Sequence, residues 1–475
     1  MNLTEDLKNP IFKTIGEISD SLGKDVYAVG GFVRDIFLQR PSKDLDFVTV
    51  GSGIELAEAV AHHLGPKAHL SVFPNYGTAQ VKFRDLELEF VGARKESYNR
   101  DSRNPIVEDG TLEDDMRRRD FTINAMAISL NEKSFGELID PFNGLIDLHS
   151  GVIKTPLDPD ITFSDDPLRM LRAIRFATQL YKKSDDSENP SYSAFRIDND
   201  TFSAIKRNAQ RMEIITRERI NDELSKIMRA PKPSVGWRLL DMAGLLPYVF
   251  PSLIPLKGVE MKEGKGHKDN FYHTIQVVDN VASRSDNEWL RWAALLHDIA
   301  KPTTKRYDPK LGWTFHNHNF IGEKMIPRIF RTMKLPLNEK MKYVAKLVGL
   351  HMRPQSVGDQ GVTDSAVRRM ITDAGNDVED LMILAESDIT SKQPDKVRRQ
   401  LEGFKKLRER MQYVHDADEL RNWKNPVDGN EIMERLGVAP GPEIARLKDI
   451  VKEAIIEGEI PYDHDAAWEY LINHK

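Results

Sequence analysis

The chain has 475 residues, of which 40% are hydrophobic and 30% are charged. This length exceeds what one ordinary hydrophobic core holds, so we expect several domains of a soluble globular protein. Cysteine is absent, which excludes disulfides and thiolate metal sites and leaves His, Asp and Glu as available metal ligands. The formal net charge of −6 argues against a uniformly basic nucleic-acid-binding protein, but not against local basic surfaces. No stretch has the roughly 18 apolar residues of a membrane span and the N-terminus is unlike a signal peptide, so we expect a cytoplasmic protein.

Residues 1–150 alternate short apolar runs with amphipathic stretches, and this pattern predicts a mixed α/β domain. Residues 44–50 alternate with the period of two that is typical of a strand, 26–29 is a short apolar run bounded by a glycine pair, and 78–83 and 86–91 are predicted to pair across Arg84-Asp85. In the predicted helices, apolar residues recur every three or four positions. The expected strands are 26–29, 44–50, 78–83 and 86–91, the expected helices begin near 32 and 54, and 123–130 is a further buried segment.

The rest of the chain has a helical pattern, apart from a polar loop at 182–193. We divide it into a neck at 151–255, a block with several histidines at 256–395 and a tail at 396–475. The predicted fold class is therefore α+β. A mixed α/β head, with a small sheet and flanking helices, would precede three all-α domains.

A glycine pair, Gly30-Gly31, stands between the first predicted strand and the following helix. Glycines at this point let backbone amides approach a phosphate at a helix N-terminus, which itself favours anions. Asp44 and Asp46 alternate on a predicted strand, so their side chains point to the same face. Mg²⁺ prefers such carboxylates together with substrate phosphates. The arrangement predicts a two-metal phosphoryl-transfer site, with Arg34 near the phosphates.

The sequence Asp-x-Asp is uninformative by itself, because it occurs five times in this chain. The ordered series of strand, Gly-Gly, helix and Asp-x-Asp strand is more specific, and a coincidental α/β turn is its alternative. The stretch 94–127 begins with a charged loop that ends in an Arg-Arg-Asp sequence at 118–120, and a buried strand or helix follows it. On a predicted neck helix, Arg169, Arg172 and Arg175 lie roughly along one face, where they suit phosphates or pair with nearby carboxylates.

With these motifs the chain resembles the family of class II tRNA nucleotidyltransferases and bacterial poly(A) polymerases. The head motif of that family, GGxVRD followed by DxD, corresponds to residues 30–35 and 44–46. Its RRD motif corresponds to 118–120, and its DPxRxLRAxRFA motif corresponds to 166–177. The resemblance covers about residues 25–230.

The resemblance implies a role for each matching residue. Asp44 and Asp46 would bind catalytic Mg²⁺ with Glu89 as a third carboxylate, although a cross-strand surface charge is the alternative for Glu89. Asp120 and one arginine of the RRD would contact the ribose 2′-hydroxyl and thereby select ribonucleotides. The residues assigned to the nucleotide are Gly30, Gly31, Arg34, Arg118, Arg119, Asp120, Asp166, Arg169, Arg172, Asn208 and Arg211.

In this family the incoming base is selected by protein side chains, in an EDxxR motif on a neck helix. The matching stretch is 207–211, in which Arg211 is kept while Arg207 replaces the Glu and Asn208 replaces the Asp. An Asn side chain both donates and accepts hydrogen bonds, whereas a carboxylate only accepts. The choice between CTP and ATP is therefore where this sequence departs from the family.

A second group of candidate ligands lies in the block 256–395. His297 and Asp298 form the one His-Asp pair of three that sits inside an apolar helix pattern, and a bound metal would compensate for burying both. With His273 upstream and Asp388 downstream, the order H…HD…D resembles the HD-superfamily phosphohydrolase domain. That resemblance implies a divalent metal, Mn, Ni, Fe or Mg, which activates water against a phosphoester.

Further histidines fit the same superfamily. His318 and His351 match its optional extra ligands, and Lys301 follows the His-Asp pair as it often does there. His316 is an alternative to His318, because both lie in the sequence WTFHNHNF. A degenerate domain kept for its structure is the alternative to a metal site.

The resemblance predicts a template-independent enzyme that adds CCA, or its terminal A, to tRNA 3′ ends from CTP and ATP. Its accessory HD domain would hydrolyse phosphoesters. One alternative is a poly(A) polymerase with the same head, and another is an HD phosphohydrolase with a non-catalytic head. The loop between Arg94 and Arg118 argues against an enzyme that adds only CC, because in this family that loop supports the switch to ATP.

The tRNA partner is inferred from the resemblance more than from charge. Residues 167–229 carry 13 basic and 9 acidic residues, and residues 396–410 carry seven and two. A solvated helix face explains either stretch, but both could contact RNA phosphates without reading bases. No membrane partner is expected, and the oligomeric state is not readable from the sequence. The predicted RNA contacts in the second stretch are Lys405, Lys406, Arg408 and Arg410.

Overall fold

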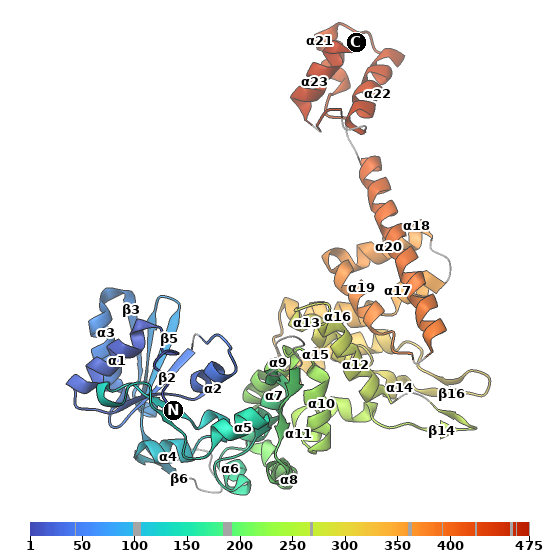
Figure 1. Cartoon of the computed structure of the whole chain (residues 1–475). Helices are drawn as coiled ribbons and strands as arrows, with labels where there is room; N and C mark the ends of the chain where they lie inside the picture. Colours follow the sequence, from blue (N-terminus) through green and yellow to red (C-terminus); the bar gives the residue numbers. More distant parts are fainter. Residues whose placement is uncertain are drawn as a thin grey trace. The chain divides into compact units, whose positions relative to one another are not determined.

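In the computed structural model the chain forms two compact units, whose helices and strands are drawn in Figure 1. The first comprises Met1–Pro354 and Ala374–Gln400, and it contains both sites predicted from the sequence. The second comprises Gln355–Asp373 and Leu401–Lys475. The structure describes residues 1–42, 44–97, 106–183, 192–266, 269–359, 363–391, 393–422, 425–456, 459–461 and 463–474.

A seven-stranded mixed sheet forms the head. Its strands are β1 (Val26–Val29), β2 (Asp44–Thr49), β3 (Ala68–Phe73), β4 (Thr78–Phe83), β5 (Leu86–Gly92), β8 (Ala127–Ser129) and β9 (Leu138–Ile139), and the main helices beside it are α1 (Pro10–Ser21), α2 (Gly31–Phe37) and α3 (Gly53–Leu64). The strand order is β3-β4-β5-β2-β1-β8-β9. β2 and β5 pair in parallel, and the other neighbouring pairs are antiparallel.

Alternation of side chains gives the sheet two different faces. Leu45, Phe47 and Phe90 are at most 3% exposed, and the rings of Phe47 and Phe90 stack with centroids 5.1 Å apart. These residues point to the face that α1 and α3 cover, and their burial fixes the register of β2 and β5. Asp46 and Glu89 consequently lie on the opposite face. The expected mixed α/β head is confirmed.

Two parts of the head differ from the sequence-based expectation. β3 was not predicted, because it is an edge strand whose side chains are mostly exposed and so carry little burial pattern. Residues 94–120 were expected to form a charged loop, but β6 (Arg94–Ser97) and β7 (Ile106–Asp109) pair in antiparallel fashion. The helix α4 (Leu112–Arg117) follows, and a capping box formed by Thr111 and Asp114 fixes its start.

The neck is helical, as expected. The ends of the expected polar loop pair as β11 (Tyr181–Lys183) and β12 (Tyr192–Ala194), and 184–191 lie outside the described residues. Trp237 and Phe250 of the neck pack against Trp292 of the following block, with ring centroids about 6 Å apart. Neck and block therefore share one core. The neck helices are α6 (Pro159–Asp165), α7 (Leu168–Gln179), α8 (Asn199–Asn208), α9 (Arg217–Met228), α10 (Pro233–Met242) and α11 (Leu246–Val249).

The histidine-containing block consists of helices and two short hairpins. Its helices in the first unit are α12 (Asn270–Ala282), α13 (Glu288–Leu296), α14 (Lys301–Thr304), α15 (His318–Met333), α16 (Glu339–Leu350) and α19 (Val378–Ser387), whereas α17 (Arg353–Asp359) and α18 (Asp364–Ala374) lie mostly in the second unit. A single helix was expected to run through the His-Asp pair, but α13 ends at Leu296. The ring of His297 bonds through Nδ1 to the carbonyl of Ala294, at 2.7 Å, which is the oxygen that a continuing helix would offer to Asp298.

The second unit is helical as well, as expected for the tail. A small core forms where α21 (Gly429–Leu436), α22 (Pro442–Ile456) and α23 (His464–Asn473) meet. The long helix α20 (Pro394–Asn422) precedes them in the chain. None of the helices in the described ranges combines the length and the apolar character needed to cross a membrane. The buried members of the small core are Val427, Ile432, Leu447, Val451, Ala467 and Leu471.

One buried cation ties the neck to the histidine-containing block. Arg291, on α13, is 3% exposed, and its guanidinium donates to the carbonyl oxygens of Met228 and Ala230 at 2.8 and 3.1 Å. The same group donates to the carbonyl oxygen of Ser285 at 3.0 and 3.2 Å. Each of these carbonyls would lose a buried partner if the guanidinium were removed.

We predict that Arg291→Met lowers the free energy of unfolding by about 2–4 kcal/mol, because several buried carbonyls lose their donor. Urea denaturation followed by circular dichroism measures this. Lys324→Met, on the exposed surface of α15, is the matched control and should stay within about 0.5 kcal/mol of the unsubstituted protein. Equal stability of the two variants would contradict this role for Arg291.

Candidate active site and metal centre

The glycine pair forms the turn between β1 and α2. Gly30 has a φ of +72°, a conformation that favours glycine. A Cβ atom at this position would lie 3.0 Å from Nη1 of Arg119 and 3.5 Å from Oδ2 of Asp46. Glycine is therefore required both by the turn and by the groups beside it. The predicted phosphate-binding turn and a predicted catalytic carboxylate lie in direct proximity.

Two carboxylates face each other across the parallel strands. Asp46 on β2 is the register partner of Glu89 on β5. Both line a small cavity of about 140 Å³, together with Arg118 and Arg119. Asp44 lies two residues before Asp46, so it points to the same face, and it is exposed. The structure thus brings the three predicted catalytic acids to one face of the sheet.

The charges of these acids suit a cation. Burial raises the pKa of Asp46, Arg119 lowers it in part, and the charge of Asp44 raises it again. Partial burial and the charge of Asp46 likewise raise the pKa of Glu89, against the effect of Arg94. Converging carboxylates that disfavour each other's ionisation form a suitable oxygen donor set for a divalent ion. Asp46 and Glu89 therefore fit the metal that the sequence predicts.

A buried acid that the sequence analysis missed holds both arginines of the RRD motif. Asp115, on α4, is fully buried, and its Oδ2 accepts from Nε and Nη2 of Arg119 at 3.1 and 3.0 Å. Its Oδ1 accepts from Nε of Arg118 at 3.0 Å. Burial favours the protonated acid, but Arg119 and Arg118 prevail and lower the pKa of Asp115 below its usual range. The spacing of the acid three and four residues before the arginines was the available signal.

A second network joins the head to the neck through Asp120. Its Oδ2 accepts from Nε of Arg172, on α7, at 2.7 Å, and its Oδ1 accepts from Asn124 at 3.0 Å. Burial opposes ionisation, yet Arg172 and Asn124 lower the pKa of Asp120 to about 2. Asn124 also accepts from Nη1 of Arg34 at 2.8 Å, and Nε of Arg34 donates to Asp35 at 2.9 Å. The sequence analysis missed Asn124, and the direct contact of Arg34 with phosphate stays a prediction.

The neck arginines have protein partners. Nη2 of Arg169 donates to the carbonyl oxygen of Arg118 at 2.7 Å, so this residue contacts the main chain of the RRD motif. Arg175 lies 2.6 Å from the buried carboxylate of Glu223. Together with the pairing of Arg172, this supports carboxylate pairing, which was one of the two expectations for these arginines. Asp166 in turn accepts from Nη2 of Arg219 at 3.0 Å.

The predicted base-selecting residues contact α6. The amide of Asn208 donates to Oδ1 of Asp160 at 2.6 Å and to the carbonyl of Ala204 at 2.9 Å. Arg211 donates to the carbonyl of Ser164 at 2.8 Å. The segment 165–169, Asp-Asp-Pro-Leu-Arg, has the same acid-acid-x-x-Arg spacing and includes the arginine bonded to the RRD main chain. The sequence analysis did not consider this segment for base selection.

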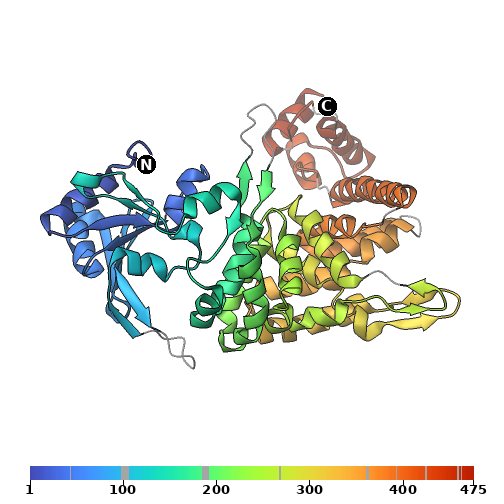
Figure 2. The same ribbon diagram turned by 60° about the horizontal axis from the view of Figure 1, so that its bottom comes forward.

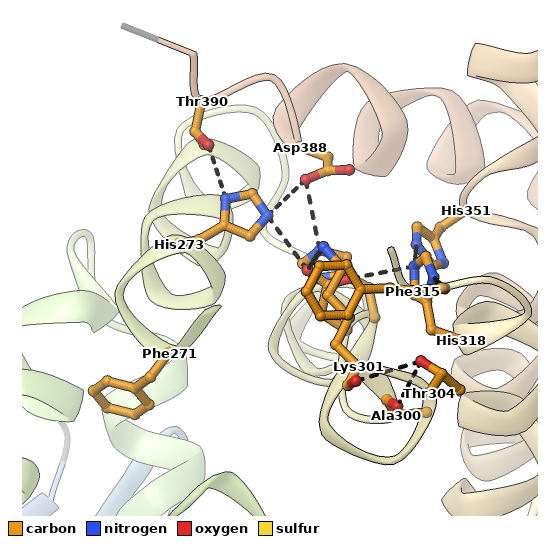
Figure 3. A network of polar contacts seen from close by, with 12 residues as sticks. Phe271, His273, Ala300, Lys301, Thr304, Phe315, His318, His351, Asp388 and Thr390 are labelled. Atoms are coloured by element: carbon orange, nitrogen blue, oxygen red, sulfur yellow. Dashed lines mark hydrogen bonds and ion pairs between the residues drawn. The ribbon is translucent and has the colours of Figure 1, made fainter. Parts of the chain in front are cut away.

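Six predicted ligands of the second site converge in the histidine-containing block (Figure 3). His273 lies in the first turn of α12, and His318 is the first residue of α15. The other four directly follow helices: His297 and Asp298 after α13, His351 after α16 and Asp388 after α19.

The six residues form two adjacent groups of three. Within each group, the ligand atoms all lie within 4.8 Å of one another. These groups are His273, His297 and Asp388, and Asp298, His318 and His351. Nε2 of His273 lies 2.9 Å from Oδ1 of Asp388, and Nε2 of His318 lies 3.2 Å from Nε2 of His351. His318 belongs to the cluster, whereas its alternative His316 is exposed.

Hydrogen bonds orient the histidine rings toward the centre of the cluster. Nδ1 of His297, His318 and His351 bonds to the carbonyl three residues earlier, at 2.7 Å in each case. Nδ1 of His273 bonds to the hydroxyl of Thr390 at 2.8 Å. A ring that donates from Nδ1 presents the lone pair of Nε2, so the cluster is arranged as metal ligands usually are.

The electrostatics of the cluster also fit a metal. Nε2 of His297 and both oxygens of Asp298 are buried without a hydrogen bond in the described structure, although Lys301 lies 2.6 Å from one oxygen. Against burial, the charges of Asp298 and Asp388 raise the pKa of His297 to about 10. Burial and the charge of His297 lower the pKa of His351 to about 3. The carboxylates thus favour a positive charge among them, and a divalent ion, bound by histidines that have lost their protons, would supply that charge and satisfy the buried atoms.

The predicted RNA contacts of α20 differ in their surroundings. Lys405 and Lys406 are exposed, but Phe404 and Leu407 beside them are buried. Arg410 pairs with Asp364. Lys406 lies 3.7 Å from Glu402, so both Lys406 and Arg410 would exchange an acidic partner for a phosphate, and the RNA contacts of α20 stay a prediction.

Three family descriptions match successive parts of the chain. Residues 26–154 match the "Poly A polymerase head domain", and residues 194–256 match the "Probable RNA and SrmB- binding site of polymerase A". Residues 270–423 match the "HD domain".

An A-adding tRNA nucleotidyltransferase of Deinococcus radiodurans is 30% identical over 364 residues, which are 75% of this chain and 78% of that protein. The chain belongs to the tRNA nucleotidyltransferase family. A multifunctional CCA protein of Shewanella frigidimarina, which is 31% identical over 66% of this chain and 70% of its own length, agrees with this. An A-adding enzyme of Aquifex aeolicus is 50% identical over 163 residues, but these are only 34% of this chain and 19% of that protein.

Solved structures of nucleotidyltransferases have the same fold. A tRNA nucleotidyltransferase complexed with a primer tRNA and an incoming ATP analog is 26% identical, with a TM-score of 0.57 over 83% of this chain and 98% of that chain. The CCA-adding enzyme of Thermotoga maritima complexed with tRNA_CCA is 21% identical, with a TM-score of 0.58 over 98% and 95%. The predicted fold class and family are therefore confirmed.

We predict that Asp115→Asn lowers kcat/KM for nucleotide incorporation by about 100-fold, because both RRD arginines lose the charge that positions them beside the cavity. Initial rates with a tRNA primer and radiolabelled nucleotide measure this. Glu113→Gln removes an equal charge from the exposed side of the same helix and is the control. A rate for Asp115→Asn within two-fold of that control would refute the positioning role.

Proposed function

We propose that this nucleotidyltransferase completes tRNA 3′ ends by adding the terminal adenosine from ATP. The observation that carries the proposal is the cavity in which Asp46 and Glu89 meet across parallel strands, next to Gly30 and the two RRD arginines. Three relatives, from Aquifex aeolicus, Deinococcus radiodurans and Geobacter sulfurreducens, are named A-adding enzymes, which favours adenosine over the full CCA sequence and over poly(A). Processing of tRNA is also compatible with the cytoplasmic location that the sequence predicts.

Each group at the site has a task in this reaction. Asp46 and Glu89, with Asp44 beside them, would hold divalent cations, which we propose to be Mg²⁺ and which lower the charge of the triphosphate and the pKa of the attacking hydroxyl. The backbone at Gly30 and Gly31 leaves room for the triphosphate. Asp115 holds the two RRD arginines in position, where their guanidinium groups face the cavity and stabilise negative charge.

The contact between the neck and the head indicates which residues select the incoming base. We assign it to Asp166 and Arg169, because Arg169 is bonded to the main chain of the RRD motif. Asn208 and Arg211, which contact α6, are the alternative. A carboxylate accepts a hydrogen bond from the amino group of adenine, and an arginine donates to its ring nitrogens.

The direct test supplies tRNAs that lack one, two or all three of the terminal nucleotides, with each NTP separately, and sequences the products. We expect a single adenosine on tRNA ending in CC and no extension of the shorter tRNAs by CTP. Incorporation of CTP would identify a CCA-adding enzyme, and repeated addition of A would identify a poly(A) polymerase. In the same assay Asp166→Asn should relax the preference for ATP, whereas Asn208→Ala should not.

For the second site we propose a metal-dependent phosphohydrolase. The convergence of six ligands, with Nδ1 of all four histidines hydrogen-bonded, favours this over a purely structural domain. Two adjacent three-residue groups suit a pair of divalent ions, for which Mn, Ni, Fe and Mg are the candidates. When bound, such ions supply an activated water at neutral pH. The protein supplies the oriented imidazoles and the carboxylates of Asp298 and Asp388.

We predict that His318→Ala reduces the metal content of the purified protein and lowers hydrolysis of bis(p-nitrophenyl) phosphate by at least about 100-fold. Inductively coupled plasma mass spectrometry gives the metal content, with each candidate metal added back after chelation. His316→Ala removes an exposed histidine two residues away and should change neither quantity. Adenosine addition should be unaffected in both variants. Equal metal content and hydrolysis in the two variants would refute the assignment.

A further inference from the structure

Two short hairpins lie side by side in the histidine-containing block (Figure 2). β14 (Met261–Lys262) pairs with β15 (Lys265–Gly266), and β16 (Arg306–Asp308) pairs with β17 (Gly312–Thr314). β15 also contacts β17, so that the two hairpins form one surface. Neither proposed activity uses this surface.

Lysines and aromatic rings alternate along the hairpins. Nζ of Lys262 lies 4.7 Å from the ring centroid of Tyr307, and the rings of Tyr307 and Trp313 are 5.2 Å apart. Nζ of Lys305 lies 4.6 Å from the ring of Trp313. All these distances are within the range of cation–π and aromatic contacts.

The same pattern continues to a ligand of the metal cluster. Phe315 follows Trp313 at the alternate position of an extended segment, which places both rings on one side. Nζ of Lys301 lies 5.6 Å from the ring of Phe315 and 2.6 Å from Oδ2 of Asp298. Figure 3 shows Lys301 and Phe315 beside the cluster. We call the series Lys262, Tyr307, Trp313, Lys305, Phe315 and Lys301 the lysine–aromatic row.

The surroundings of the row are basic and partly apolar. Residues 256–266 and 301–315 carry seven basic and three acidic residues. The acids have partners in the hairpins: Glu260 lies 2.5 Å from Nζ of Lys305, and Glu263 accepts from the hydroxyl of Tyr307 at 2.7 Å. Met261 and Leu311 are 65% and 75% exposed. A ligand of this surface should thus combine negative charge with flat apolar groups.

We propose that the lysine–aromatic row binds single-stranded RNA and leads it toward the metal cluster. Bases stack on aromatic rings whatever their sequence, and Lys262 is placed to pair with a phosphate, whereas Lys305 and Lys301 would exchange Glu260 and Asp298 for phosphates. An acidic polypeptide would satisfy the lysines but would leave the rings unused. A duplex keeps its bases stacked inside and therefore offers none to the row.

Fluorescence anisotropy with a fluorescein-labelled single-stranded RNA hexamer, and the full-length protein, tests this. Trp313→Leu and Lys262→Ala should each weaken binding by about ten-fold, through lost stacking and a lost phosphate contact. For Lys262→Ala the dependence of log K on log salt should also become shallower, by about 0.7. Lys340→Ala removes an exposed lysine 5.0 Å from the ring of Trp289, outside the row, and should leave binding unchanged.

Duplex RNA and poly-glutamate serve as the competing ligands. The proposal is overturned if both row variants bind the hexamer as the unsubstituted protein does, or if poly-glutamate binds as tightly and loses affinity in the same variants. Adenosine addition to tRNA and hydrolysis of the small phosphodiester should be retained in all three variants. A failure of either proposed function would appear in those two activity assays, whereas a failure of the RNA-binding proposal would appear only in the binding of the hexamer.

Discussion

The parallel pairing of β2 with β5 is the constraint on which the active site depends. It places Asp46 opposite Glu89, while Phe47 and Phe90 on the other face stack in the core. A shift of one residue would send the acids into the core and the rings to the solvent, so packing of one face fixes the chemistry of the other. The positive φ of Gly30 and the buried charge of Asp115 then bring a turn and two arginines to the same cavity.

The ligands of the second site are positioned by helix ends rather than by strand pairing, because most of them directly follow a helix. Carbonyl groups that lack a helical partner at such ends accept hydrogen bonds from Nδ1 of His297 and His351. The helix ends therefore orient the rings as well as position them. The same region joins the neck through Arg291 and a shared aromatic core, so the two sites belong to one compact unit.

The sequence predicted the elements better than their pairing. The pattern of apolar residues and glycines identified β1, β2, β4 and β5 and the pairing of β4 with β5. The order of His and Asp residues, with the extra ligands that the HD resemblance implies, singled out all six members of the metal cluster. The sequence did not reveal β3, because an exposed edge strand has little burial pattern, nor the pairing of β6 with β7. The partners of Arg118 and Arg119 were missed because the burial of Asp115 depends on tertiary packing. The segment 165–169 has the acid-acid-x-x-Arg spacing in the sequence itself but was assigned only to the DPxRxLRAxRFA motif, and its contact with the RRD main chain exists only in the folded chain.

The most direct test of this account is the single-turnover rate of adenosine addition to tRNA ending in CC by Glu89→Gln, compared with Glu87→Gln. Both substitutions remove one charge from the same face of β5, but only Glu89 is paired with Asp46 and lines the cavity. The account predicts a loss of at least about 1,000-fold for Glu89→Gln and a near-normal rate for Glu87→Gln. Similar rates for the two variants would contradict a carboxylate site across β2 and β5.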